Sequence, residues 1–124
     1  MFLAKIKNEK RSESYFIEAV SYTDAEEIVT SEFPSATIKA ISGQKFSFVL
    51  KSDAEEDDRF FKCKIASISD DGSKSTIPAL VQCVDAEHCI KRLNEEMKEW
   101  VSSENFIVSV SDSRAEGIIG KKQE

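Results

Sequence analysis

The chain has 124 residues, which suits one domain or two small units that share one core. Its composition is 40% hydrophobic and 32% charged, with four glycines and two prolines, and this excludes disorder along the whole length. The 17 basic and 23 acidic residues give a net charge of −6, which disfavours long-range attraction to nucleic acid or anionic membranes but leaves room for a local basic face.

The sequence also indicates the cellular compartment in which the protein is expected. No apolar run approaches the roughly 20 residues that cross a bilayer. Charges in the opening MFLAKIKNEK come too early for the apolar region of a signal peptide. Cys63, Cys83 and Cys89 are an odd number without a disulfide pattern, which is typical of a reducing compartment. We therefore expect a cytoplasmic protein that does not enter a membrane.

The first half of the chain predicts strands on either side of one helix. Phe2, Ala4 and Ile6 alternate with other residues, as in a half-buried strand. The polar stretch 8–14 is the expected hairpin connection to a second strand. Apolar residues within 38–42 and 48–50 predict two later strands.

The first helix has a predicted start and end. Thr23 and Glu26 have the spacing of a capping box, in which two side chains satisfy unpaired backbone amides. We expect the helix to run to about Phe33, because Pro34 cannot continue it.

The second half follows an acidic connection at 52–58 and predicts the same elements. Phe61, Cys63 and Ile65 face inward on a strand that ends at a turn over 70–73, where Asp-Gly is a strong turn signal. Asp85 is the expected cap of a second helix. Its predicted apolar stripe consists of Ala86, Cys89, Ile90, Leu93, Met97 and either Trp100 or Val101.

The two halves align as an internal repeat. Matching blocks pair 2–6 with 61–65, 18–20 with 82–84, 24–26 with 85–87, 38–42 with 107–111, and 48–50 with 117–119. We therefore expect an α+β fold of two tandem strand-strand-helix-strand(-strand) repeats, with antiparallel strands in one sheet or two and both helices on an apolar face. The predicted single domain comprises repeat one (1–51), the acidic connection (52–58), repeat two (59–120) and a frayed tail (121–124).

The sequence gives little support to catalysis or metal binding. Cys83, His88 and Cys89 are close in sequence, but we expect buried thiols and a surface histidine, because a structural zinc site usually has four ligands in spaced pairs. Cys89 and His88 are the least improbable catalytic pair, and the glycines are single and widely spaced, unlike a phosphate-binding loop. We expect no enzyme activity, cofactor or metal.

A binding face is the remaining candidate. Cations alternate with inward residues on the first strand of each repeat, and aromatic residues lie near them in the sequence. A sheet face with cations and exposed rings is a common way to hold single-stranded nucleic acid. The predicted nucleic-acid-binding residues are Lys5, Lys7, Lys62, Lys64, Phe46, Phe48 and Phe60. Alternatively, Phe16 and Leu80 belong to a second apolar face that another subunit covers.

The chain also resembles a small uncharacterised family found in gut anaerobes, their phages and mobile elements. The resemblance is strongest at Asp57-Asp58-Arg59-Phe60-Phe61-Lys62-Cys63-Lys64, and it extends over most of the chain. It implies a phage or mobile-element setting and no catalytic residues.

The leading hypothesis is a non-enzymatic module that binds single-stranded DNA or RNA and forms a homo-oligomer. A protein-interaction or structural protein, or one that inhibits a host protein, is the first alternative. A protein that sequesters a nucleotide in a cleft between the repeats is the second.

Overall fold

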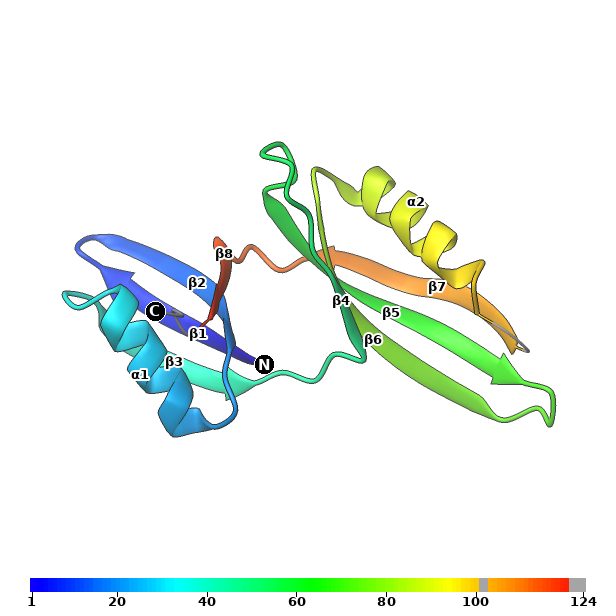
Figure 1. Ribbon diagram of the computed structural model, residues 1–124, viewed down its shortest axis with the longest axis horizontal. Coiled ribbons are helices and arrows are strands. Elements are labelled where there is room, and N and C mark those ends of the chain that lie inside the picture. The colour runs from blue at the N-terminus through cyan, green and yellow to red at the C-terminus, as the bar shows by residue number, and fades with distance from the viewer. Residues whose placement is uncertain (101–102, 121–124) are drawn as a thin grey trace. The chain divides into compact units, whose positions relative to one another are not determined.

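The structure is a computed structural model that describes residues 1–100 and 103–120, and it contains two four-stranded sheets with one helix each (Figure 1). Its elements are β1 (Phe2–Asn8), β2 (Arg11–Glu18), α1 (Tyr22–Glu32), β3 (Thr37–Gly43), β4 (Phe48–Leu50), β5 (Arg59–Ser69), β6 (Lys74–Cys83), α2 (Ala86–Met97), β7 (Ser103–Asp112) and β8 (Gly117–Gly120). The α+β class is confirmed, and the strand-strand-helix-strand order expected of the repeated unit occurs twice, as β1-β2-α1-β3 and β5-β6-α2-β7. Of the two strand arrangements expected, the structure has two sheets.

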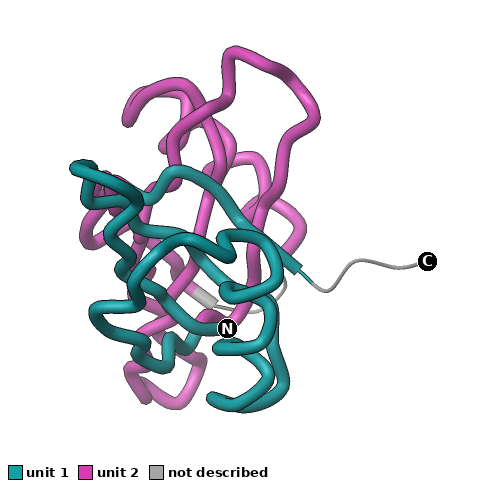
Figure 2. The backbone as a smooth tube through the Cα atoms, turned by 90° about the vertical axis from the view of Figure 1, so that its left-hand side faces the viewer, with its two compact units in different colours: residues 1–45, 115–124 teal, residues 46–114 magenta. Residues whose placement is uncertain are grey.

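Two compact units divide the chain. Unit 1 consists of residues 1–45 and 115–124, and unit 2 consists of residues 46–114 (Figure 2). The predicted frayed tail, 121–124, lies outside the described residues.

Unit 1 has the strand order β3-β1-β2-β8, with β8 parallel to β2 and the other pairs antiparallel. One sheet face packs against α1, because the inward residues of β1 alternate and the helix contributes a stripe at three- and four-residue steps. The buried cluster consists of Ala4, Ile6, Ile17, Ala25, Ile28 and Val29.

Unit 2 has the strand order β4-β6-β5-β7, with β4 parallel to β6. Its helix, α2, packs on one face through Cys89 and Leu93, which are both fully buried. The sheet residues of this cluster are Phe61, Cys63, Ile65, Ala79, Val81 and Cys83.

The pairing registers show how closely the two units correspond. Phe2 lies opposite Ile17 in unit 1, and the aligned Phe61 lies opposite Val81 in unit 2. The pairing of the first strand with the third strand has a register shift in each repeat. The shift lies between Lys5 and Ile6 in unit 1 and at the aligned step, between Lys64 and Ile65, in unit 2. The sequence alignment of these strands is thus reproduced residue by residue.

The first residues of the two helices show that one block of that alignment was wrong. The predicted cap Thr23 is wrong: α1 is capped by Ser21, whose hydroxyl accepts a hydrogen bond from the Asp24 amide at 3.1 Å. The Asp24 carboxylate in turn accepts from the Val20 amide at 3.1 Å, which completes the reciprocal cap. Asp85 caps α2 as predicted, so Ser21 and Asp85 are the equivalent residues and the helix block was misaligned by three positions.

Two further local predictions differ from the structure. The first hairpin turns at Glu9 and Lys10, so Arg11–Ser14 belongs to β2 and not to a long connection. In α2, Ala86 is exposed and Ile90 is 40% exposed, so the buried stripe is narrower than predicted. Val101, one of the two residues proposed to end this stripe, lies outside the described residues.

Other local predictions agree with the structure. The turn between β5 and β6 contains Gly72 at φ +85°, a conformation that glycine adopts without steric cost. Among the described residues, no helix is long and apolar enough to cross a membrane.

Candidate binding face

Each sheet has one face covered by its helix and one face that carries lysines. Residues that pair across neighbouring strands point to the same side of a sheet. Lys5 pairs with Ser14, and Lys7 with Ser12, so these exposed lysines lie with hydroxyls on the face of unit 1 opposite α1. Cations and hydroxyls at one face are suited to contact an anion.

The same rule places Lys62 and Lys64 on the face of unit 2 opposite α2. Lys64 is exposed and pairs with Pro78 and Ser109, while Lys62 is half-buried and pairs with Leu80 and Ser111. Among the described residues, neither lysine has an ion-pair partner. No described carboxylate therefore forms an ion pair with either ammonium group.

Phe106 is the aromatic residue that the structure adds to this face. It pairs with Ala66, two residues along β5 from Lys64, and 51% of it is exposed. A strand rises about 3.3 Å per residue, so the Cα atoms of Ala66 and Lys64 are roughly 7 Å apart. The exposed Phe106 ring and Lys64 thus lie near each other on one face of the sheet.

A shallow hollow lies beside the Phe106 ring. Its volume is about 270 Å³, and it is lined by Ala66, Ile68, Lys74, Ser75, Thr76 and Phe106. Ala66, Ile68 and Phe106 supply apolar lining, whereas the polar lining residues Lys74, Ser75 and Thr76 belong to β6. We call the set Lys62, Lys64, Lys74, Thr76, Phe106 and Ser109 the Phe106 face.

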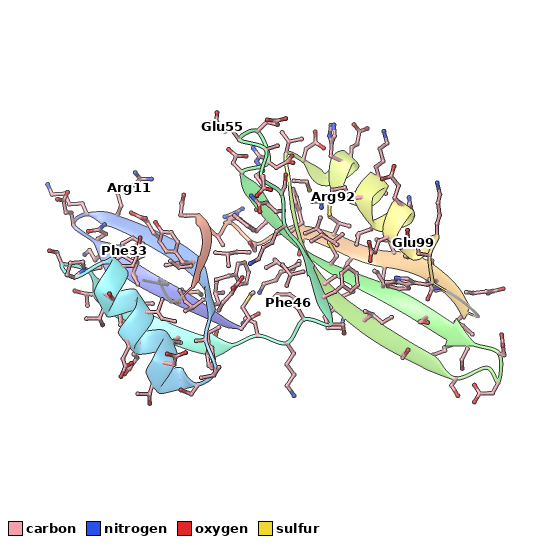
Figure 3. All side chains as sticks on the ribbon, viewed as in Figure 1. Arg11, Phe33, Phe46, Glu55, Arg92 and Glu99 are labelled. Atoms are coloured by element: carbon pink, nitrogen blue, oxygen red, sulfur yellow. The ribbon has the colours of Figure 1, made fainter. Side chains whose placement is uncertain are left out.

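The rings predicted from the sequence lie elsewhere. Phe60 is only 5% exposed. Phe48 packs edge-on against Trp100, with ring centroids 5.7 Å apart, in the cluster under α2. Phe46 is half-buried on the segment between β3 and β4 (Figure 3). The structure brings the lysines of unit 2 together with Phe106 rather than with Phe48.

Sequence reasoning missed Phe106, although a signal was present. Val108 is the unpaired residue at the irregularity in β7, so the alternation of inward and outward side chains changes phase there. Ile107 packs under α2, and the residue before it must then point to the opposite face.

Phe16 and Leu80, the predicted interface residues, are both fully buried within the single chain. Each lies on the sheet face opposite its helix, and each pairs with a short parallel strand, Phe16 with Ile118 and Leu80 with Val49. An interface with a second subunit stays a prediction.

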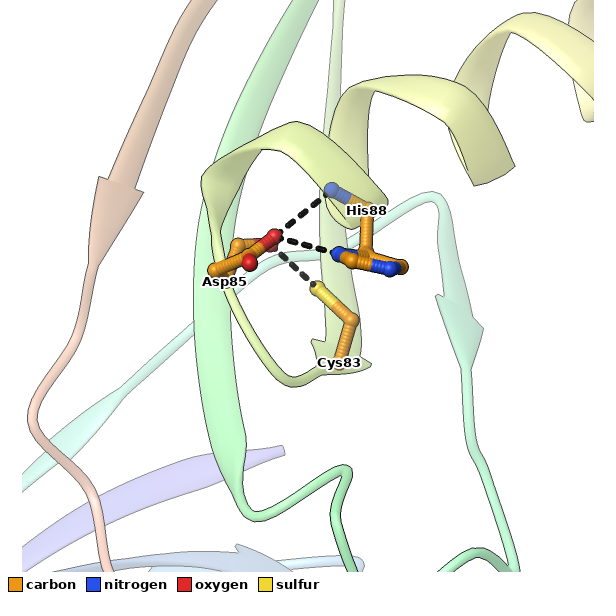
Figure 4. A network of polar contacts seen from close by, with 3 residues as sticks. All are labelled: Cys83, Asp85 and His88. Carbon is orange, nitrogen blue, oxygen red and sulfur yellow. Dashed lines mark hydrogen bonds and ion pairs between the residues drawn. The ribbon is translucent and has the colours of Figure 1, made fainter.

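The thiols of Cys83 and Cys89 are buried, whereas His88 is exposed in the first turn of α2. The Asp85 carboxylate accepts a hydrogen bond from the His88 backbone amide at 2.8 Å, and this bond holds the pKa of the carboxyl below its usual value. The same carboxylate contacts the His88 ring nitrogen Nδ1 at 2.7 Å (Figure 4). Burial raises the pKa of the Cys83 thiol to about 12. A hydrogen bond with Cys63, at a sulfur–sulfur distance of 3.4 Å, and burial raise the pKa of Cys89. Protonated thiols are poor nucleophiles.

In the described part of the chain, no group of three or more Cys, His, Asp or Glu side chains has the geometry to hold a metal ion. The side chain of His88 is 62% exposed, whereas Cys83 and Cys89 are buried in the core cluster of unit 2.

The acidic connection is fastened to unit 2. Gln82 accepts from the Ser52 amide at 3.1 Å and donates to the Asp57 carbonyl at 2.7 Å. Arg92, on α2, donates to the carbonyls of Gln82 at 2.6 Å and Lys51 at 3.1 Å (Figure 3). These bonds give the segment a structural role and leave Glu55 and Glu56 exposed at its turn.

Comparison with known proteins places the chain in a family. No curated protein matches it, and no solved structure matches it. One family model, described as Domain of unknown function (DUF4494), matches residues 3–121, which is nearly the whole chain. The protein therefore belongs to this family of domains of unknown function.

Proposed function

We propose that the protein is a non-enzymatic binding module that holds single-stranded nucleic acid on the Phe106 face. The observation that carries the proposal is an exposed aromatic ring on the same sheet face as lysines that have no ion-pair partner among the described residues. Single strands bind to such surfaces because bases stack on rings while cations contact the phosphates. A duplex does not expose its bases for stacking, so single strands are preferred.

The distribution of charge supports a local site on an acidic protein. The described carboxylates of unit 2 lie mainly on α2 and in the connections, whereas its sheet face opposite α2 carries Lys62, Lys64 and Lys74. Glu104 is an exception, because it pairs with Ile68 on the Phe106 face. With a net charge of −6 for the whole chain, we expect weak binding that falls steeply with salt.

The setting is also part of the proposal. The resemblance to proteins of gut anaerobes, phages and mobile elements supports a role in such an element. The three unpaired, buried cysteines support a cytoplasmic location, because thiols stay reduced there. A homo-oligomer is the proposed state. The proposal rests on the sequence pattern of apolar residues on both sides of β2 and β6, although Phe16 and Leu80 are buried within the single chain.

Fluorescence anisotropy with labelled single strands tests the function. Phe106→Thr gives unit 2 the residue that unit 1 has at the aligned position, Thr37, which pairs with Lys7 as Phe106 pairs with Ala66. Loss of one stacked base should weaken binding roughly 5- to 150-fold. Val108→Thr is the matched control, because Val108 is 57% exposed on the same strand at the irregularity.

The lysines give a second readout. Lys64→Gln should weaken binding and reduce the slope of log K against log salt by about 1. Lys5→Gln changes the aligned lysine of unit 1, where no ring occupies the equivalent position, and should have the smaller effect. No binding by the unmodified protein at tens of micromolar and low salt would refute the proposal.

A protein-interaction role is the second candidate. Arg92, Glu95, Glu96 and Glu99 surround a shallow, mostly polar depression beside Leu50 (Figure 3). Exposed carboxylates on one helix end favour a basic partner. Under this alternative, replacing Glu95 and Glu99 with glutamine would abolish capture of a partner, and Phe106→Thr would leave capture unchanged.

A further inference from the structure

The last strand of each repeat pairs in the other repeat's sheet. β4 follows the first three strands of repeat one in sequence, yet it pairs with β6 of repeat two. β8 ends repeat two, yet it pairs with β2 of repeat one. In Figure 2, residues 115–120 therefore have the colour of unit 1 and residues 46–50 have the colour of unit 2.

The two pairings are equivalent residue by residue. Val49 lies opposite Leu80, and Ile118 lies opposite the aligned Phe16. Both strands are parallel to their partners, and Leu50 and Ile119 occupy the same place, partly buried against the helix-side clusters of their units. One strand crossing to the other sheet would be a local irregularity; two equivalent crossings indicate a reciprocal exchange.

We propose that β4 and β8 are reciprocally exchanged docking strands, and that the two repeats form a stable two-part complex without a covalent link between them. Each repeat alone has three strands and leaves the backbone groups of its second strand unpaired at a sheet edge. In the part of the chain that the structure describes, each of these edges is occupied by the apolar fourth strand of the other repeat. This inference is independent of the proposed function.

The exchange predicts that the connection between repeats can be cut. A recognition sequence for a site-specific protease, inserted between Glu55 and Glu56 in the full chain, places the cut at an exposed turn between β4 and β5. The fragments then contain β1 to β4 and β5 to β8. They should co-elute at the position of the uncut chain on size exclusion and separate only in denaturant.

A pair of variants shows whether the exchanged strands hold the fragments together. Leu50→Asp and Ile119→Asp place a charge at the equivalent positions of β4 and β8, where both side chains pack against a core. The doubly substituted chain should stay in one piece before the cut, because the covalent connection remains, and should separate into two fragments after it. Val108→Asp is the control: it lies on β7, which pairs with β5 of the same fragment, so its cut chain should co-elute.

Two results would overturn the proposal. The unsubstituted fragments could separate after the cut under native conditions, which would show that strand exchange does not hold them. Alternatively, the cut chain with both aspartates could co-elute like the unsubstituted one, which would show that other contacts hold the fragments.

Discussion

Leu93→Ala tests which side of α2 faces the sheet of unit 2. Leu93 is fully buried in the cluster with Cys63 and Cys89, and Met97 and Trp100 pack beside it. The substitution removes three carbon atoms, worth about 2 kcal/mol in transfer from water, and leaves a cavity that adds to the cost. We expect the free energy of unfolding of unit 2 to fall by about 3 kcal/mol.

Ile90→Ala is the control on the same helix. Sequence periodicity placed Ile90 in the buried stripe, but in the structure it is 40% exposed. The substitution loses the free energy of burying part of the Ile90 side chain, and the higher helix propensity of alanine offsets a few tenths of a kcal/mol of that loss. The expected cost is therefore below about 1 kcal/mol.

Urea unfolding followed by fluorescence gives both values. Trp100 is the chain's single tryptophan and packs against the core of unit 2, so its emission reports on that unit. If Ile90→Ala lowered the stability as much as Leu93→Ala, the rotation of α2 about its axis would be wrong.

Three further predictions concern the helix cap, the pH dependence and the binding face. Ser21→Ala should lower the free energy of unfolding by about 1 kcal/mol in thermal or urea unfolding, because the helix cap is lost, whereas Thr23→Ala should have little effect. A larger loss of stability for Thr23→Ala than for Ser21→Ala would show that Thr23 is the cap. Burial and a hydrogen bond to Glu13 raise the pKa of Tyr15 to about 12, so the unfolded phenol ionises first and stability falls as the pH rises from about 10 to 12. Tyr15→Phe should reduce this loss in unfolding experiments across that range, and an unchanged pH profile would contradict the assignment. Glu104→Gln should strengthen binding of single strands in anisotropy, because it removes a negative charge from the Phe106 face; weaker binding would argue against an anionic ligand there.

The strands could be predicted because the alternation of apolar residues occurs twice in the chain, once in each repeat. Phe2 and Phe61 head equivalent strands, and the structure pairs them equivalently with Ile17 and Val81. The cap of α1 was missed because Thr23 with Glu26 and Ser21 with Asp24 have the same spacing, and only the backbone geometry distinguishes them.

The exchange of β4 and β8 could not be read from the sequence. The alignment identified both segments as strands, but choosing a sheet edge depends on contacts far apart in the chain. Phe106 was missed for a related reason, because the irregularity at Val108 shifts the phase of β7. Predicting either feature requires knowledge of which strands pair, whereas local sequence patterns indicate only where the strands lie in the chain.

The most direct test of the proposed function is a titration of isotope-labelled protein with an unstructured oligonucleotide, followed residue by residue by NMR. The account predicts saturable shifts at the amides of Lys64, Ala66, Thr76, Phe106 and Ser109, all on or beside the Phe106 face. Shifts confined to α2, or none at millimolar oligonucleotide and low salt, would contradict it.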